Sequence, residues 1–251
     1  MPRTKLSLIE RFQRYFSIHL ARTAAQRSAV YGVRYRVYCE QFGYEPAEAF
    51  PDREESDAFD ARSLHCLVVH QRTRQPAACV RLVPALGDTV EDPLPIESIF
   101  RETLDYRLIN ALELDRQQVC EISRLAVDRA FRRRSGEGSS RVGEPDSARY
   151  APHERSTFPF ICMAAFLGAT ALTEITGRTQ VFAMMEPFLA RMLTRSGIHF
   201  QRVGGDLEYH GLRAPYFTTT QQALEDMTAD TRAMYSAIAD RIHTEYRLLE
   251  D

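Results

Sequence analysis

The segment 119–127 constrains the fold most, because this apolar, β-forming run holds two opposite charges three residues apart, Glu121 and Arg124. A buried charge is costly unless it has a partner, so the strand is expected to border a polar cleft. Residues three apart on a regular strand face opposite sides of the sheet. Glu121 and Arg124 can therefore share one site only if a β-bulge resets the alternation. The alternative is an edge strand with two solvated charges.

Size and composition favour a single domain over residues 1–251. The chain is 44% hydrophobic and carries a net charge of -2, which excludes a nucleic-acid-binding field over its whole surface. Its five cysteines are scattered and odd in number, as in proteins of reducing compartments. Charges interrupt the N-terminal apolar residues, and the longest apolar run, 161–172, is too short for a membrane span. We therefore expect a cytoplasmic protein without a membrane span.

Apolar spacing predicts a helical N-terminus over about residues 5–42. An amphipathic helix over 5–20 follows from the spacing of Leu8, Ile9, Phe12, Phe16 and Leu20. A second helix over about 24–42 ends near Gly43, a residue type suited to the position after a helix. An acidic loop is expected over 45–60. Two β-rich runs, 64–70 and 77–84, predict a hairpin, and a helical segment is expected near 96–114.

The composition changes abruptly after the strand at 119–127. Residues 129–156 form an Arg- and Gly-rich insertion with little apolar content, which we expect to be mobile without a ligand. A strong helix over 157–176 ends at Gly177. Strands at 180–185, 198–203 and 216–219, a helix at 187–195 and a helical C-terminus over about 221–249 follow. This order mixes hairpin and crossover connections and predicts an α+β sheet with helices on both faces.

A series of residues within roughly 30–128 resembles, in order and much of its spacing, the acyl-homoserine-lactone synthases and the related N-acyl amino acid synthases. The series comprises Arg34, Tyr38, Tyr44, Asp57, Asp60, Arg81, Phe100, Glu121 and Arg124. These families have a GNAT-type acyltransferase fold. The resemblance therefore implies a GNAT-like central mixed sheet flanked by helices, with the β-bulge of the central strand near Glu121 and Arg124.

Two stretches are similar to the acyltransferases associated with PEP-CTERM/exosortase systems. They are YRVYCEQFGYE at 35–45 and HGLRAPYF at 210–217, and the Arg/Gly-rich insertion fits the same group. The chain departs from the homoserine-lactone synthases at Tyr44, where they usually carry Trp, and in the length of its insertion. These departures weaken the case for S-adenosylmethionine as the acceptor.

The resemblance implies an acceptor site and a catalytic pair. In GNAT-type transfer an amine attacks a thioester directly, and the enzyme aligns the substrates, accepts a proton and stabilises the oxyanion. Glu121 is the candidate proton acceptor with Arg124 beside it, and the alternative for Glu121 is a structural ion pair. Asp57 and Asp60 have an alternative role as caps that anchor the N-terminal helices. Substrate contacts are expected from Arg34, Tyr38, Tyr44, Asp57, Asp60, Arg81 and Phe100.

The insertion supplies the candidate donor site. Arg133, Gly136 and Gly138 approximate the Arg-x-x-Gly-x-Gly loop with which GNAT enzymes bind the pyrophosphate of coenzyme A. The candidate donor-binding residues are Arg132, Arg133, Arg134, Gly136 and Gly138. The same arginines could dock an acidic acyl carrier protein or remain a solvated loop. Apolar residues in 158–167 and 182–185 are candidate acyl-tunnel walls or ordinary core. The histidines lack metal-ligand spacing, so neither a metal nor a tightly bound cofactor is expected.

We therefore expect an N-acyltransferase that moves a fatty acyl chain from acyl carrier protein, or from acyl-CoA, to the amine of an amino acid or a related small molecule. Acyl carrier protein would be its protein partner. Two rival functions remain at this point. One is an acyl-homoserine-lactone synthase that consumes S-adenosylmethionine, and the other is a non-catalytic GNAT-like module that only binds an acylated carrier.

Overall fold

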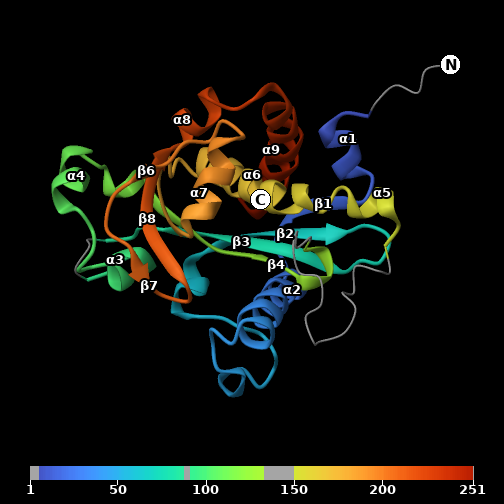
Figure 1. Ribbon diagram of the computed structural model, residues 1–251, viewed down its shortest axis with the longest axis horizontal. Helices are drawn as coiled ribbons and strands as arrows, with labels where there is room; N and C mark the ends of the chain where they lie inside the picture. Colours follow the sequence, from blue (N-terminus) through green and yellow to red (C-terminus); the bar gives the residue numbers. More distant parts are fainter. Residues whose placement is uncertain (1–5, 88–90, 133–149, 251) are drawn as a thin grey trace.

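The computed structural model in Figure 1 describes residues 6–87, 91–132 and 150–250. Within them, eight strands form one mixed sheet in the order β1-β2-β3-β4-β5-β8-β6, and β7 pairs with β8 beside this path. Neighbouring strands are antiparallel except β4 and β5, which are parallel. The strands are β1 Phe16–Leu20, β2 Leu64–His70, β3 Pro76–Pro84, β4 Val119–Val127, β5 Gln180–Met185, β6 Gln201–Arg202, β7 Leu207–Glu208 and β8 Leu212–Thr219.

Helices cover both faces of the sheet, with α2 on one face and α6 and α9 on the other (Figure 1). The α-helices are α1 Leu8–Gln13, α2 Ala24–Tyr35, α3 Pro95–Ile99, α4 Tyr106–Ala111, α5 Pro152–Arg155, α6 Pro159–Ile175, α7 Pro187–Thr194, α8 Thr220–Glu225 and α9 Ala229–Glu250. A π-helix, η1, spans Arg36–Gln41, and 3-10 helices span η2 Ala47–Ala49, η3 Ala58–Arg62, η4 Arg116–Gln118 and η5 Arg129–Phe131. In the part described, no helix is long and apolar enough to cross a membrane.

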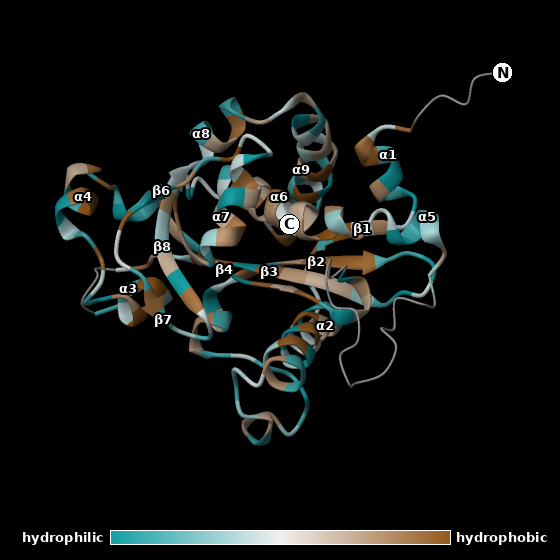
Figure 2. Cartoon of the chain, viewed as in Figure 1, coloured by the Kyte–Doolittle hydropathy of each residue, from teal (hydrophilic) through white to brown (hydrophobic). Residues whose placement is uncertain are grey.

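Apolar side chains fill both sides of the sheet, and in Figure 2 much of the ribbon of β2 and β3 has the colours of hydrophobic residues. Ile122 and Leu167 belong to the cluster between the sheet and α6. Val33 and Ala126 belong to the cluster between the sheet and α2. A further cluster on the α2 side of the sheet, which we call the α3 cluster, contains Phe100 and Phe182. The two faces of β4 are therefore buried against different layers.

The predicted N-terminal helix over 5–20 is wrong in its second half. Helix α1 ends at Gln13, and Phe16–Leu20 forms the edge strand β1, in which Phe16, Ile18 and Leu20 are buried. The spacing of four between Phe16 and Leu20 is compatible with a helix but also with the period of two of a strand. The buried Ile18 between them satisfies only the strand.

The predicted helix over 24–42 changes type along its length. Helix α2 ends at Tyr35, and the π-helix η1 continues to Gln41. Single π-helical turns often occur at functional sites, and this one carries Tyr38. The chain then turns back, because the Tyr44 and Glu45 N–H groups both donate to the Tyr38 carbonyl, at 2.7 and 3.3 Å.

The expected mobile insertion over 129–156 is wrong at both ends. Phe131 and Tyr150 are buried and their rings lie 5.2 Å apart, next to His70. Glu154 is also buried and contacts His70 Nε2 at 2.6 Å. Phe131 and Tyr150 lie in the cluster against α6, so these ends belong to the core. The composition of the segment as a whole concealed these few apolar anchors.

We expect Gly168→Leu to destabilise the protein, because Gly168 is where α6 lies against β1 and β2. A Cβ at this position would lie 2.5 Å from Ile18 Cδ1 and 3.1 Å from Cys66 Sγ. Overpacking of this kind costs about 1–3 kcal/mol, and urea unfolding measures it. Gly205→Leu is the control, because a Cβ there has no neighbour closer than 3.7 Å. Equal unfolding midpoints for the two variants would contradict this packing.

Candidate active site

A β-bulge interrupts β4 at the candidate catalytic pair. Arg81 and Cys79, two residues apart on β3, pair with Ser123 and Ala126, which are three apart on β4. The extra residue falls at Arg124, whose φ is +53°, in the left-handed region. An L-residue other than Asn or Asp is uncommon there, and such strain gathers at functional sites. The bulge on which a shared site depends is therefore present.

The bulge places Glu121 and Arg124 on the same side of the sheet. Before it, Ile122 faces the α6 cluster, and after it Leu125 and Val127 pack against that same cluster. Arg124 instead contacts Asp57, at 3.0 Å from Nη2 to Oδ2, on the side of α2. Without the extra residue, the Arg124 side chain would point to the opposite face.

Three arginines and three carboxylates form an ion-pair network on this side, with equal numbers of opposite charges. Arg34 contacts Glu55 through Nε and Asp60 at 2.7 Å through Nη1. Arg81 Nη1 contacts Asp57 at 2.6 Å and Asp60 at 2.9 Å. Arg124 Nη2 contacts Asp57 and, at 3.3 Å, Glu55. The members of this network are Arg34, Arg81, Arg124, Glu55, Asp57 and Asp60.

The network is buried except at one corner. Arg34 and Arg81 are at most 1% exposed, whereas the side chains of Arg124 and Asp57 are 19% and 25% exposed. Burial disfavours the ionised form of Asp60, but its hydrogen bond and charge interaction with Arg34 outweigh this and hold the pKa of Asp60 well below its ordinary value. A small molecule approaching from solvent therefore reaches this network through Arg124 and Asp57.

The two aspartates serve the fold as well as the network. Asp57 is the N-cap of η3 and accepts from the Phe59 N–H at 2.9 Å, while Asp60 Oδ2 accepts from the Asp57 N–H at 2.7 Å. The two residues therefore cap η3 and not the N-terminal helices, while Asp60 is joined to α2 through Arg34. The capping shapes a turn that presents the carboxylates to Arg34 and Arg81.

Glu55 is a network member that the sequence interpretation missed. It is 1% exposed and lies between Arg34 and Arg124, in the segment expected to be a simple loop. Charge balance could have predicted Glu55. Three arginines that are buried together require three acidic partners, and the predicted site residues include only two, Asp57 and Asp60. Ser123 was missed as well, and its Oγ accepts from Arg81 Nε at 3.2 Å.

Glu121 lies outside the network and is fully buried. Its Oε2 accepts a hydrogen bond from the Ile96 N–H at 2.6 Å, and its Oε1 has no partner. Burial raises the pKa of Glu121 to about 7, while the Ile96 hydrogen bond and the charges of Arg81 and Arg124 oppose this rise. A carboxyl with this pKa can accept and release a proton near neutral pH. The alternative role for Glu121 was a structural ion pair, but Glu121 forms no salt bridge with any described residue.

The strands β4 and β5 part beside Glu121. Their pairing extends only from Val119 and Gln180 to Ile122 and Ala183, although β4 continues to Val127 and β5 to Met185. Arg124 and Leu125 also have no register partner on β3. The bulge therefore frees main-chain groups from the ladder next to the carboxyl of Glu121.

The aromatic candidates have different locations. The Tyr38 hydroxyl donates to the Leu125 carbonyl at 3.4 Å, and the Arg124 guanidinium lies 5.6 Å from the Tyr38 ring. Tyr44 lies 6.5 Å from Tyr38, so both rings belong to the exposed corner of the network. Phe100 is fully buried in the α3 cluster, and no ring contact or hydrogen bond joins its described side chain to the network.

The candidate donor residues are only partly visible. Arg132 donates from Nε to the Val127 carbonyl at 2.8 Å, and its guanidinium lies 4.9 Å from the Phe42 ring. Arg133, Arg134, Gly136 and Gly138 lie outside the described residues. Of the apolar candidates for an acyl tunnel, those buried in the cluster against α6 are Phe158, Ile161, Phe166, Leu167 and Met185.

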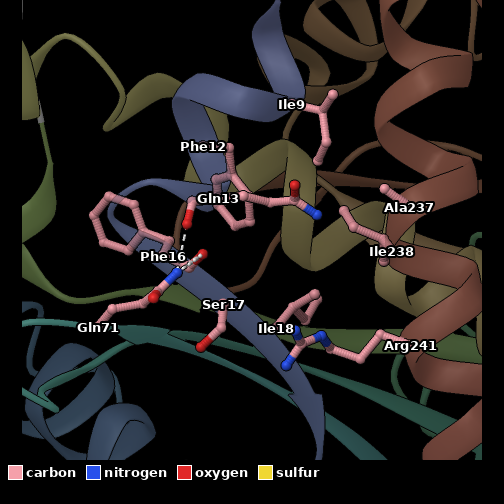
Figure 3. A pocket seen from close by; sticks show the side chains of 10 residues that line it. All are labelled: Ile9, Phe12, Gln13, Phe16, Ser17, Ile18, Gln71, Ala237, Ile238 and Arg241. Atoms are coloured by element: carbon pink, nitrogen blue, oxygen red, sulfur yellow. Dashed lines mark hydrogen bonds between the residues drawn. The ribbon is translucent and has the colours of Figure 1, made fainter.

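Two surface cavities lie away from the network. Figure 3 shows one of about 280 Å³ between α1, β1 and α9, lined by Phe12, Ile18 and Arg241 among others. The other, of about 560 Å³, is formed by residues next to α4 and β6. Neither includes a residue of the network, so we build the site from the charges and not from these cavities. The described residues contain no group of three His, Cys, Asp or Glu that could hold a metal.

We expect the unfolding free energy of Glu121→Gln, measured relative to that of the wild type, to be higher at pH 8 than at pH 5. The ordinary pKa of the carboxyl, near 4.5, rises to about 7 on folding. The folded state therefore binds more protons than the unfolded state between these values, and wild-type stability falls as the pH rises through that range. The difference in unfolding free energy between Glu121→Gln and wild type should shift by on the order of 2 kcal/mol between the two pH values.

Urea unfolding at both pH values measures this shift. The control is Glu102→Gln, the same change at an exposed glutamate. A Glu121→Gln effect that is the same at pH 5 and pH 8 would show that Glu121 titrates as an ordinary surface carboxyl.

Comparison with known proteins agrees with this fold. A profile of the acetyltransferase (GNAT) domain matches residues 33–139, a range that holds Glu121 and all six members of the network. TofI, solved in a ternary complex with an inhibitor and MTA, is 20% identical with a TM-score of 0.57, over 92% of this chain and 99% of TofI. No curated protein matches the sequence.

Two more solved structures have the same fold. BjaI, a CoA-dependent acyl-homoserine lactone synthase solved with MTA, is 14% identical with a TM-score of 0.57, over 94% of this chain and all of BjaI. FeeM, an N-acyl amino acid synthase from uncultured soil microbes, is 11% identical with a TM-score of 0.55, over 86% of this chain and 96% of FeeM. The expected GNAT-type fold is confirmed, and the matched domain agrees with the acyltransferase class. Residues 33–139 match the acetyltransferase (GNAT) domain, and the chain as a whole has the fold of these synthases.

Proposed function

We propose that the protein is an N-acyltransferase that moves a fatty acyl group from a carrier thioester to the amine of an amino acid or a related small molecule. The observation that carries the proposal is Glu121, a buried carboxyl with a free Oε1 and a pKa near 7, at the point where β4 and β5 part. This carboxyl suits a proton acceptor for an amine at neutral pH. The reaction we propose is a direct aminolysis of the thioester.

In this reaction the acceptor nitrogen attacks the thioester carbonyl carbon. The N–C bond forms, the C–S bond breaks, and the carrier leaves as a thiol. Glu121 accepts the proton that the amine loses, directly or through one water, and the leaving thiolate takes up a proton. Main-chain N–H groups freed at the β4 bulge would stabilise the oxyanion, which is the usual role of such donors in acyl transfer.

The exposed corner of the network suits the acceptor. Arg124 can bind an acceptor carboxylate, since its side chain is partly exposed and a guanidinium forms paired hydrogen bonds with a carboxylate. The Asp57 carboxylate beside it can bind an ammonium group. The buried members Arg34, Arg81, Asp60 and Glu55 would hold these two side chains in place without touching the acceptor themselves. Tyr38, next to the Arg124 guanidinium, and Tyr44, next to Tyr38, would border the bound acceptor.

The cysteines favour direct transfer over a covalent thioester on the protein. Burial raises the pKa of all five thiols, to about 11 for Cys39 and Cys162 and to about 12 for Cys79. A thiol with a raised pKa is a poor nucleophile. All five are also free, which fits the cytoplasm as the site of the reaction.

Wild-type enzyme supplied with an acyl thioester and a mixture of amino acids should release free thiol and form an N-acyl amino acid. We expect Glu121→Gln to lower kcat by about 100-fold or more, because the amide cannot accept the proton. Thiol release and mass spectrometry of the product measure both effects, and Glu102→Gln is the matched control.

Two results would replace the proposal. Product formed only with S-adenosylmethionine as the acceptor would make the protein an acyl-homoserine-lactone synthase, as BjaI is. Binding of the thioester without turnover for any acceptor would make it a non-catalytic binding module.

The donor is proposed to be acyl carrier protein, because Arg132, Arg133 and Arg134 form a run of positive charge suited to an acidic protein. Changing all three to alanine should weaken use of acyl carrier protein and flatten its salt dependence, with little effect on a short pantetheine thioester. If the three arginines bind coenzyme A phosphates instead, the same variant should mainly raise KM for acyl-CoA. Steady-state kinetics with all three donors distinguishes binding of acyl carrier protein from binding of acyl-CoA. Identical kinetics for variant and wild type would show that the three arginines do not bind the donor.

A further inference from the structure

The turn between β7 and β8 has a fixed shape. His210 and Gly211 have φ values of +53° and +92°, and the Tyr209 N–H donates to the Gly211 carbonyl at 3.0 Å. Arg213 donates to the carbonyls of Tyr209, at 3.0 Å, and His210, at 3.1 Å. These contacts come from within the hairpin. The tip, which we define as residues 209–211, therefore has its conformation before any substrate binds.

This tip reaches across to the segment that follows η1. The His210 ring lies 4.8 Å from the Tyr44 ring, and His210 Nε2 lies 3.7 Å from Glu45 Oε1. Tyr209 lies 4.3 Å from His210. More than 160 residues separate the two contacting segments. The sequence motif at 210–217 therefore begins with a residue that touches the candidate acceptor site.

His210 completes a column of stacked groups. The Arg132 guanidinium lies 4.9 Å from the Phe42 ring, and the Phe42 and Tyr44 rings are stacked at 4.9 Å with planes 11° apart. The His210 ring is the next member, at 30° to Tyr44. We call Phe42, Tyr44 and His210 the aromatic column. Because Tyr44 is stacked on Phe42 and the tilted His210 ring lies 4.8 Å from it, the Tyr44 ring is already engaged within the protein.

The column stands beside the exposed corner of the ion-pair network. Tyr38 lies between the two, 6.5 Å from the Tyr44 ring and 5.6 Å from the Arg124 guanidinium. The hairpin tip is therefore linked to the exposed corner of the network through His210, Tyr44 and Tyr38.

We propose that His210 is a specificity-determining residue that restricts the acceptor amine to one with a small side chain, such as glycine or alanine. This inference rests on the proposed acyltransferase function. An acceptor held by Arg124 and Asp57 has its side chain next to the aromatic column, where His210 occupies space and covers Tyr44. An aromatic acceptor finds no free ring of the column on which to stack.

The main test replaces His210 with glycine, which removes the ring and suits the left-handed backbone at this position. His210→Phe keeps a ring of similar size, and the exposed His199 supplies the control variant His199→Ala. Each protein is assayed for thiol release with glycine, alanine, leucine and phenylalanine as acceptors and one fixed acyl donor. Unfolding midpoints show that each variant is folded.

We expect His210→Gly to raise the ratio of kcat/KM for phenylalanine to that for glycine by about tenfold or more, the size of effect seen when a pocket gains room. The change should appear in the KM of the acceptor and leave the KM of the donor unaltered. His210→Phe and His199→Ala should keep the wild-type ratio.

The outcomes separate this inference from the function on which it rests. If the wild type transfers acyl groups to amines but His210→Gly leaves the ratio unchanged or lowers it, His210 does not exclude large acceptors and the inference is wrong. A lower ratio would mean that the imidazole stacks on large acceptors. If the wild type acylates no amine at all, the proposed function fails, and this inference fails with it.

Discussion

The balance of charge around Arg34 holds the candidate site together. Arg34 is fully buried and contacts Glu55 and Asp60, which also contact Arg124 and Arg81. A buried pair that loses one member leaves an uncompensated charge, which costs about 3–5 kcal/mol. The η3 turn, helix α2 and strands β3 and β4 are thus joined through charges that none of them could bury alone. Arg124 keeps its strained backbone next to two carboxylates that bind its side chain.

The site combines two electrostatic environments on one strand. Arg124 lies among opposite charges that keep it ionised, whereas Glu121, three residues earlier, has apolar neighbours and a single N–H donor. The first environment suits binding of a charged acceptor, and the second suits exchange of a proton. The β-bulge makes the combination possible, because it turns both side chains to the same face while they remain in different surroundings.

Much of the sheet could be predicted from the sequence, because hairpin strands, Val119–Val127 and the long helix α6 have strong local patterns. The bulge followed from one argument, that two charges three apart need it to share a site. Edge strand β1 was mistaken for helix because its spacing satisfied both periods. Glu55 was missed because a buried carboxylate in an acidic segment has no local signature. The contact between His210 and Tyr44 joins segments far apart in the chain, and no local pattern reports such a pair.

The ion-pair network has a consequence for the order of folding. Its members come from α2, the η3 region, β3 and β4, so 90 residues separate Arg34 from Arg124. Contacts between distant segments form only after the intervening chain has closed into loops, and they slow folding. In a chain in which β4 has not yet paired with β3, the charged residues of the network are not in contact with one another. The proposed acceptor site would therefore form only after β3 and β4 have paired and the η3 region has packed against α2.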